Sequence, residues 1–197
     1  MSIVVELISW FFLLLAISAG AGMVLIKDWK WNLGSFALQY LGVFYFVQLD
    51  WPVRLALIKL LGGLTSGLVL FLSQRGSLPN PKSDLEWPQG IFFRFLGLGL
   101  VILMATALTP QLVAWLGLIH YFGVWVGIFL MGIGLFQLGM TSQPMRIIIS
   151  ILIFLVGFEI IYAYVETSIL VALMLVTINL GLSFVGGYIL SPANLEK

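Results

Sequence analysis

Glu159 is the residue of this sequence best placed to do chemistry, because it is an acidic side chain inside a long apolar stretch. It occupies the segment ILIFLVGFEIIYAY, thirteen residues after Arg146, which corresponds to about 20 Å along a helix. Burying a charge in a membrane costs about 2.5–3.5 kcal/mol on insertion scales, so a carboxyl group at this position is a candidate proton carrier. A carboxyl group that hydrogen-bonds to a neighbouring helix, or that reaches outward to the surface, is the alternative interpretation.

Two further polar side chains lie inside apolar stretches, Lys59 in RLALIKLLGG and Asn179 in LVTINLGLS. A buried lysine can relay protons or tune a neighbouring carboxylate. The long stem of Lys59 can instead carry its ammonium group to the outer interface beside Arg54, and the sequence slightly favours this second interpretation. Asn179 is typical of a hydrogen bond between helices. Glu159, Lys59 and Asn179 are therefore the three candidates for proton transfer.

The other polar residues indicate no site of their own. Glu6 and Glu166 fall near the ends of apolar stretches, where we expect them to be solvated, and we expect Arg94 and Arg146 to anchor the inner surface. His120 is the only histidine and cysteine is absent, which makes a metal, haem or iron–sulfur site improbable. The sequence contains neither a Ser–His–Asp set nor a phosphate loop, so we expect no cofactor and no enzymatic activity.

Seven apolar stretches must position these side chains. The chain has 197 residues, of which 61% are hydrophobic and 9% charged, whereas about a quarter of a soluble domain is charged. A membrane-spanning helix needs roughly 20 apolar residues, and the second stretch is at the short limit. The sequence predicts an all-α, polytopic transmembrane helical bundle with spans at Ile3–Ile26, Leu33–Leu49, Val53–Leu72, Ile91–Leu108, Tyr121–Met140, Ile147–Tyr164 and Ser168–Leu190.

The breaks between the spans carry further signals. The segment Thr109–His120 is ambiguous, because it can lie along the interface or extend the fourth or the fifth span. Tryptophans at or near breaks are typical of membrane interfaces; they are Trp29, Trp31, Trp51, Trp87 and Trp115. Small residues spaced four apart predict close helix packing; the pairs are Ala16 with Gly20, Gly63 with Gly67, and Gly123 with Gly127.

The distribution of basic residues predicts how the chain is oriented in the membrane. With seven spans, one side of the membrane holds Lys27, Lys30, Arg75, Lys82, Arg94, Arg146 and Lys197, and the other has only Arg54 near its surface. The positive-inside rule then places the N-terminus outside and the C-terminus inside. The proline-containing linker 73–90 is predicted to be a cytoplasmic loop between a three-span half, 1–72, and a four-span half, 91–197.

The segments GIGLFQLGMTSQPMRIIISILIFLVGFEIIYAY and ILVALMLVTINLGLSFVGGYIL resemble the small K-type membrane subunit of complex I. They are also similar to its relatives, the C-type small subunit of Mrp sodium/proton antiporters and component E of membrane-bound hydrogenases. The resemblance implies a three-helix core over 121–190, a basic inner loop at Arg146 and a mid-membrane glutamate in Gly157-Phe158-Glu159. The longer component E type also carries extra spans before this core. The third helix of the family usually bears a second acidic residue, where this chain has Asn179.

The resemblance implies a non-catalytic subunit of a multisubunit proton- or cation-translocating, or respiratory-type, assembly. Its partners are then other integral membrane subunits, antiporter-like or quinone-linked, together with membrane lipid and without nucleic acid. A bacterial inner membrane is the simplest location, and a thylakoid or other organellar membrane stays open. The alternative is a scaffold or assembly protein with no ion path of its own. A stand-alone transporter is disfavoured by the shortage of polar residues at mid-membrane depth.

Overall fold

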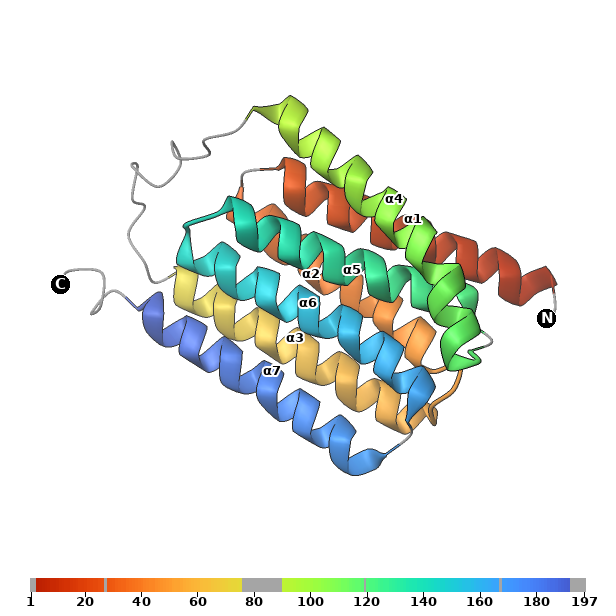
Figure 1. The fold of residues 1–197 in the computed structure, drawn as a ribbon. Helices are drawn as coiled ribbons and strands as arrows, with labels where there is room; N and C mark the ends of the chain where they lie inside the picture. Colours follow the sequence, from red (N-terminus) through yellow and green to blue (C-terminus); the bar gives the residue numbers. More distant parts are fainter. Residues whose placement is uncertain (1–2, 27, 76–89, 119, 167, 192–197) are drawn as a thin grey trace.

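The fold is a bundle of seven α-helices, seen in a computed structural model that describes residues 3–26, 28–75, 90–118, 120–166 and 168–191 (Figure 1). The described residues contain no strand, and the predicted all-α fold is confirmed. The helices are α1 (Ile3–Leu25), α2 (Trp29–Val47), α3 (Val53–Arg75), α4 (Ile91–Leu116), α5 (Tyr121–Met140), α6 (Pro144–Val165) and α7 (Ile169–Ile189).

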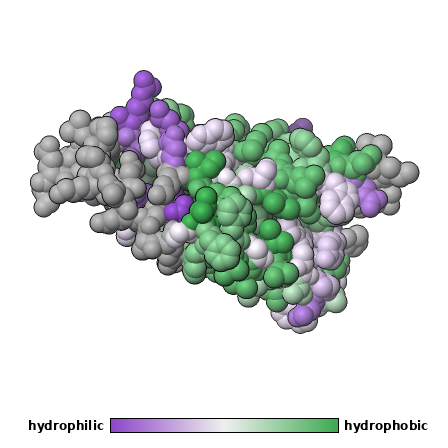
Figure 2. Space-filling model, turned by 90° about the horizontal axis from the view of Figure 1, so that it is seen from above, coloured by the Kyte–Doolittle hydropathy of each residue, from purple (hydrophilic) through white to green (hydrophobic). Residues whose placement is uncertain are grey.

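Six of these helices are long and apolar enough to cross a membrane, and α2 is the exception. The 19-residue α2 lies inside the bundle and buries polar side chains such as Asn32 and Gln39, so it needs less apolar character than a helix that faces lipid. Large apolar side chains are exposed on the outer helices, as Phe92 of α4 and Leu170 of α7 illustrate. Figure 2 shows the resulting apolar surface across the middle of the molecule, with hydrophilic residues gathered toward its ends. These are the features of a multi-pass membrane protein.

The helices form two layers, α1–α2–α3 and α4–α5–α6–α7, in which neighbours in the chain pack side by side. Between the layers, α1 contacts α4 and α5, α2 contacts α6, and α3 contacts α7. Each layer therefore comes from one side of the segment 76–89. The cytoplasmic loop predicted over 73–90 lies mostly outside the described residues. We refer to the two ends of the bundle as the His120 end and the Arg146 end.

Small residues let the helices approach closely, as predicted. A methyl group added to Gly157 of α6 would lie 2.5 Å from the carbonyl oxygen of Gly127 in α5, so the two backbones are in contact there. Gly20 of α1 instead makes room for the side-chain ring of Phe129 in α5. The predicted packing pairs are confirmed: the partners of the remaining members are Tyr40 for Gly63, Phe36 for Gly67 and Tyr164 for Gly123, and Ala16 is buried.

Two helix boundaries differ from the sequence prediction by four residues or more. The ambiguous segment after Leu108 extends α4, which continues through Pro110 and ends at Gly117, whose backbone is left-handed (φ 65°) and whose N–H donates to Val113. Proline is tolerated inside a membrane helix because nearby groups satisfy the freed carbonyl. The predicted start of the second span at Leu33 is wrong by four residues, because Asp28 caps α2 by accepting a hydrogen bond from the Lys30 N–H (3.0 Å).

Candidate functional site

Lys59 of α3 and Glu159 of α6 form an ion pair in the interior of the bundle. Lys59 Nζ lies 3.4 Å from Glu159 Oε2, and the two side chains are only 2% and 1% exposed. Asn179 of α7 donates a hydrogen bond from Nδ2 to Glu159 Oε1 (2.8 Å). The structure thus brings the three sequence candidates together, on three helices drawn from both layers.

Helix direction puts the two charges at the same depth. Lys59 is six residues after the first residue of α3, and Glu159 is six residues before the last residue of α6. Both positions are about 9 Å from the His120 end, since a helix rises about 1.5 Å per residue. Because α3 and α6 belong to different layers, the pair lies where the layers meet.

The preferred interpretation of Lys59 from the sequence, with its ammonium group at the outer interface beside Arg54, is wrong. Lys59 lies on the buried face of α3 with Ala56, Gly63 and Ser66, whereas Arg54 is exposed. The carboxylate opposite provides the charge partner that repays much of the cost of removing the ammonium group from water. Sequence spacing along α3 alone does not reveal that partner, because it comes from another helix.

Trp51 covers the ion pair on the side of the His120 end. Its ring centroid is 4.9 Å from Lys59 Nζ, and its indole Nε1 donates to the carbonyl oxygen of Ala163 (2.8 Å), one turn beyond Glu159. The residue is 2% exposed, so the expectation that Trp51 lies at the membrane interface is wrong, whereas Trp31 and Trp115 are exposed. Pro52 follows Trp51 and directly precedes α3, and its carbonyl oxygen accepts hydrogen bonds from the backbone N–H groups of Leu55 and Ala56.

Tyr40 of α2 is the second component that sequence reasoning missed. Its ring lies against Gly63 of α3, one turn from Lys59, and its hydroxyl is close enough to Glu159 for an electrostatic interaction. Tyr40 is 1% exposed, and its hydroxyl has no hydrogen-bond partner in the described part of the chain. The glycine spacing at Gly63 is the signal that could have indicated a large side chain packed at this point.

The Arg146 end contains a second buried polar group. With the amide of Asn32 oriented to match its neighbours, its oxygen accepts from Arg146 Nη2 (3.3 Å) and its nitrogen donates to the Met23 carbonyl (3.0 Å). Arg94 Nη1 donates to the Leu25 carbonyl (3.4 Å). Both arginines are 3% exposed, so the expectation that they anchor the surface is wrong.

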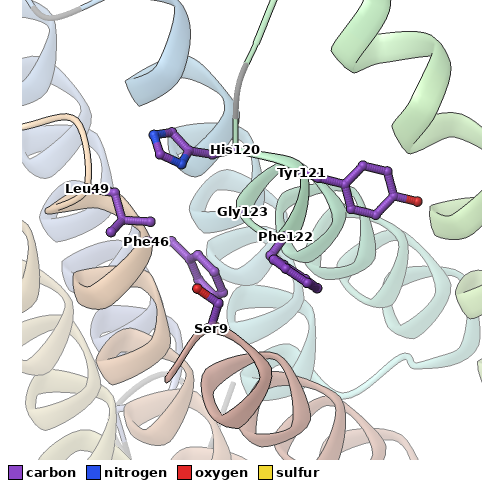
Figure 3. A pocket seen from close by; sticks show the side chains of 7 residues that line it. All are labelled: Ser9, Phe46, Leu49, His120, Tyr121, Phe122 and Gly123. Atoms are coloured by element: carbon purple, nitrogen blue, oxygen red, sulfur yellow. The ribbon is translucent and has the colours of Figure 1, made fainter. Parts of the chain in front are cut away.

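The His120 end carries a small cavity of about 90 Å³, lined mainly by apolar residues (Figure 3). His120 Nε2 lies 3.2 Å from Asp50 Oδ1 at its edge, and the His120 ring packs beside Tyr164 (centroids 5.4 Å apart). In Figure 3 the Tyr121 ring points away from the other lining side chains. Glu6 and Glu166 are exposed, as expected. The described residues contain no group of three His, Cys, Asp or Glu side chains that could hold a metal ion.

Comparison with protein-family models, curated proteins and solved structures gives no match. The site is therefore interpreted from its own geometry. It consists of one acidic, one basic and one amide side chain close to one another. The indole of Trp51 covers them on one side, and they are buried away from bulk water. Such an arrangement can bind and pass a proton, and it can also hold three helices in register.

Proposed function

We propose that this chain is a non-catalytic membrane subunit in which the Lys59–Glu159 pair takes up and releases protons. It would do so within a larger proton- or cation-translocating assembly. The observation that carries the proposal is the pair itself: two opposite charges 3.4 Å apart and at most 2% exposed, with Asn179 bound to the carboxylate.

Stability alone is a poor reason for such a pair. Removing two charges from water costs several kcal/mol per ion, and well-packed apolar side chains at the same places are often as stable or more stable. In a protein of 197 residues with only 9% charged, an ion pair buried inside the bundle is therefore better explained by chemistry. A proton transferred from the ammonium to the carboxylate leaves two neutral groups, so the pair has two arrangements of the same total charge.

The resemblance of the C-terminal half to the K-type family supports the same proposal. It pairs Glu159 with the mid-membrane glutamate of that family and makes α5, α6 and α7 the corresponding three helices. Asn179 replaces the second acidic residue and instead donates to Glu159. Antiporter-like or quinone-linked membrane subunits are the proposed partners, and a bacterial inner membrane is the proposed location.

The test is Glu159→Gln in cells, with proton translocation measured in membrane vesicles by the quenching of a pH-sensitive dye. The matched control is Glu166→Gln, an exposed carboxylate seven residues further along the chain. We expect the first variant to abolish the proton gradient and the second to leave it unchanged, with translocation divided in each case by the amount of assembled complex on native gels. Normal translocation by assembled Glu159→Gln protein would refute the proposal.

A scaffold or assembly role is the second candidate, and one observation favours it. The cluster joins α3, α6 and α7. In the scaffold role, its whole purpose is to hold together helices that other subunits bind. The double variant Lys59→Met/Glu159→Gln separates the two functions, because it removes both charges and leaves none orphaned. If it assembles and still translocates protons, the scaffold role is supported; if it assembles and does not, the proton-binding role is supported.

A further inference from the structure

We infer that the Lys59–Glu159 pair exchanges protons with the Arg146 end of the bundle only, and that Trp51 closes the path from the His120 end. The inference rests on the proposed proton-binding role, and it specifies from which end of the bundle protons reach the pair. Two independent features of the described residues carry it: the closure above the pair and the unpartnered polar atoms below it.

On the side of the His120 end, the polar groups are satisfied and the pair is covered. Trp51 lies over Lys59 and is fixed to α6 by its hydrogen bond to Ala163. The neighbouring Tyr164 donates to the Phe46 carbonyl (3.0 Å) and Ser9 shares a hydrogen bond with Tyr45 (3.0 Å). The cavity of Figure 3 does not reach the pair, since neither charged residue lines it.

On the side of the Arg146 end, buried polar atoms lack partners in the described part of the chain. Ser66 Oγ, Asn179 Oδ1 and both amide atoms of Gln39 and Gln137 make no hydrogen bond there, and all four side chains are at most 3% exposed. Each such atom costs about 1–3 kcal/mol unless it is paired. Water supplies both donors and acceptors, so it is the partner that suits amides and a hydroxyl alike.

The depths of these side chains form a series that leads away from Trp51. Counting from the His120 end of each helix at about 1.5 Å per residue, Gln39 lies about 12 Å deep, Asn179 about 15 Å, Ser66 about 20 Å and Gln137 about 24 Å. Ser66 follows Lys59 by seven residues, which places both on the same face of α3. The unpartnered atoms therefore extend from the ion pair toward the Arg146 end, a course that bridging water could follow.

The absence of cysteine makes the test clean, because a single introduced thiol is the only one in the chain. Ser66→Cys is treated with a charged, membrane-impermeant methanethiosulfonate in the assembled complex, from each side of sealed vesicles. Thr65→Cys is the matched control, since Thr65 is exposed on the outer face of α3 and a thiol in lipid does not ionise. Arg75→Cys and Glu166→Cys, both exposed, identify the sides of the Arg146 end and the His120 end.

We expect Ser66→Cys to react from the Arg146 end at least about tenfold faster than Thr65→Cys, because only a water-exposed thiol forms thiolate. It should not react from the His120 end. The added substitution Trp51→Ala should open that second side. Ser183→Cys, on α7 one turn from Asn179, gives an independent measurement of the same path should Ser66→Cys not assemble.

Reaction of the buried thiols from the His120 end, or from neither side, would overturn the inference. Either result leaves the proposed function standing if Glu159→Gln still abolishes translocation. Conversely, thiols reached from the Arg146 end in a protein whose Glu159→Gln variant translocates normally would refute the proton-binding role, and with it the inference that rests on it. The two failures are therefore distinguishable.

Discussion

Replacing Lys59 with methionine tests the ion pair most directly, because it keeps the apolar stem and removes the charge. Glu159 then loses the ammonium group at 3.4 Å and keeps the amide of Asn179 at 2.8 Å. Its side chain is 1% exposed, so bulk solvent does not contact the carboxylate directly. The carboxylate becomes a buried charge with one hydrogen bond.

The magnitude follows from what remains at the site. Breaking a buried ion pair by removing one partner costs about 3–5 kcal/mol, because the other charge stays uncompensated. The remaining hydrogen bond places the loss near the lower limit, at about 3 kcal/mol, or roughly a hundredfold in the folding equilibrium. The double variant Lys59→Met/Glu159→Gln has no orphaned charge, and we expect its free energy of unfolding to lie within about 1 kcal/mol of the unmodified protein.

The pH dependence of each single variant has a defined sign. In Lys59→Met the orphan is an acid, so protonation removes its charge and the destabilisation becomes smaller as the pH falls. In Glu159→Gln the orphan is a base, so deprotonation removes its charge and the destabilisation becomes smaller as the pH rises. The double variant has neither group and should show neither trend.

The free energy of unfolding is measured by titrating sodium dodecyl sulfate into protein held in mild-detergent micelles and following helix content by circular dichroism. All three variants and the unmodified protein are compared at acid, neutral and alkaline pH. Equal destabilisation by the single and the double variants would refute the reasoning, since it would mean that the loss comes from packing. So would a single variant as stable as the unmodified protein.

Three further stability predictions use the same measurement. Gly157→Ala should destabilise by about 1–3 kcal/mol because its methyl group meets the backbone of α5. Gly99→Ala should not destabilise, because no atom of another helix lies within 4 Å of the added methyl group. Trp51→Phe should cost about 1 kcal/mol by losing the indole donor, and Trp115→Phe, 81% exposed, should change stability little. Asn179→Leu should cost about 1.5–3 kcal/mol, because it removes the hydrogen-bond donor to the Glu159 carboxylate. A cost near zero would mean that this hydrogen bond does not stabilise the protein.

Sequence reasoning identified the three polar members of the site, but it predicted neither their pairing nor the presence of Trp51 and Tyr40 around them. Depth within an apolar stretch singled out Glu159, Lys59 and Asn179, because each is a polar group where lipid would otherwise be the solvent. Which faces of the helices meet depends on the packing of residues a hundred positions apart. The helices are apolar on nearly every side, so the direction of the apolar face, which orients helices in soluble proteins, gives little guidance here.

Trp51 and Arg146 show the second reason for the errors. Tryptophan and arginine near the end of a membrane span usually lie at the interface, because their polar atoms reach water there. In this protein both find partners inside the bundle, Trp51 at the carbonyl of Ala163 and Arg146 at the amide of Asn32. A rule based on distance from the span end cannot anticipate such partners, since they are contributed by the opposite layer.

The division of the bundle into two layers has a consequence for how the protein is made. The partner of Lys59 is 100 residues later in the chain, and the carbonyl that holds Trp51 is 112 residues away. At about 5–20 residues per second, synthesis leaves α3 without either for roughly 5–20 seconds. During that interval α3 either enters the bilayer with an unpaired lysine, at a cost of about 2.5–3.5 kcal/mol, or stays beside the bilayer until α6 emerges.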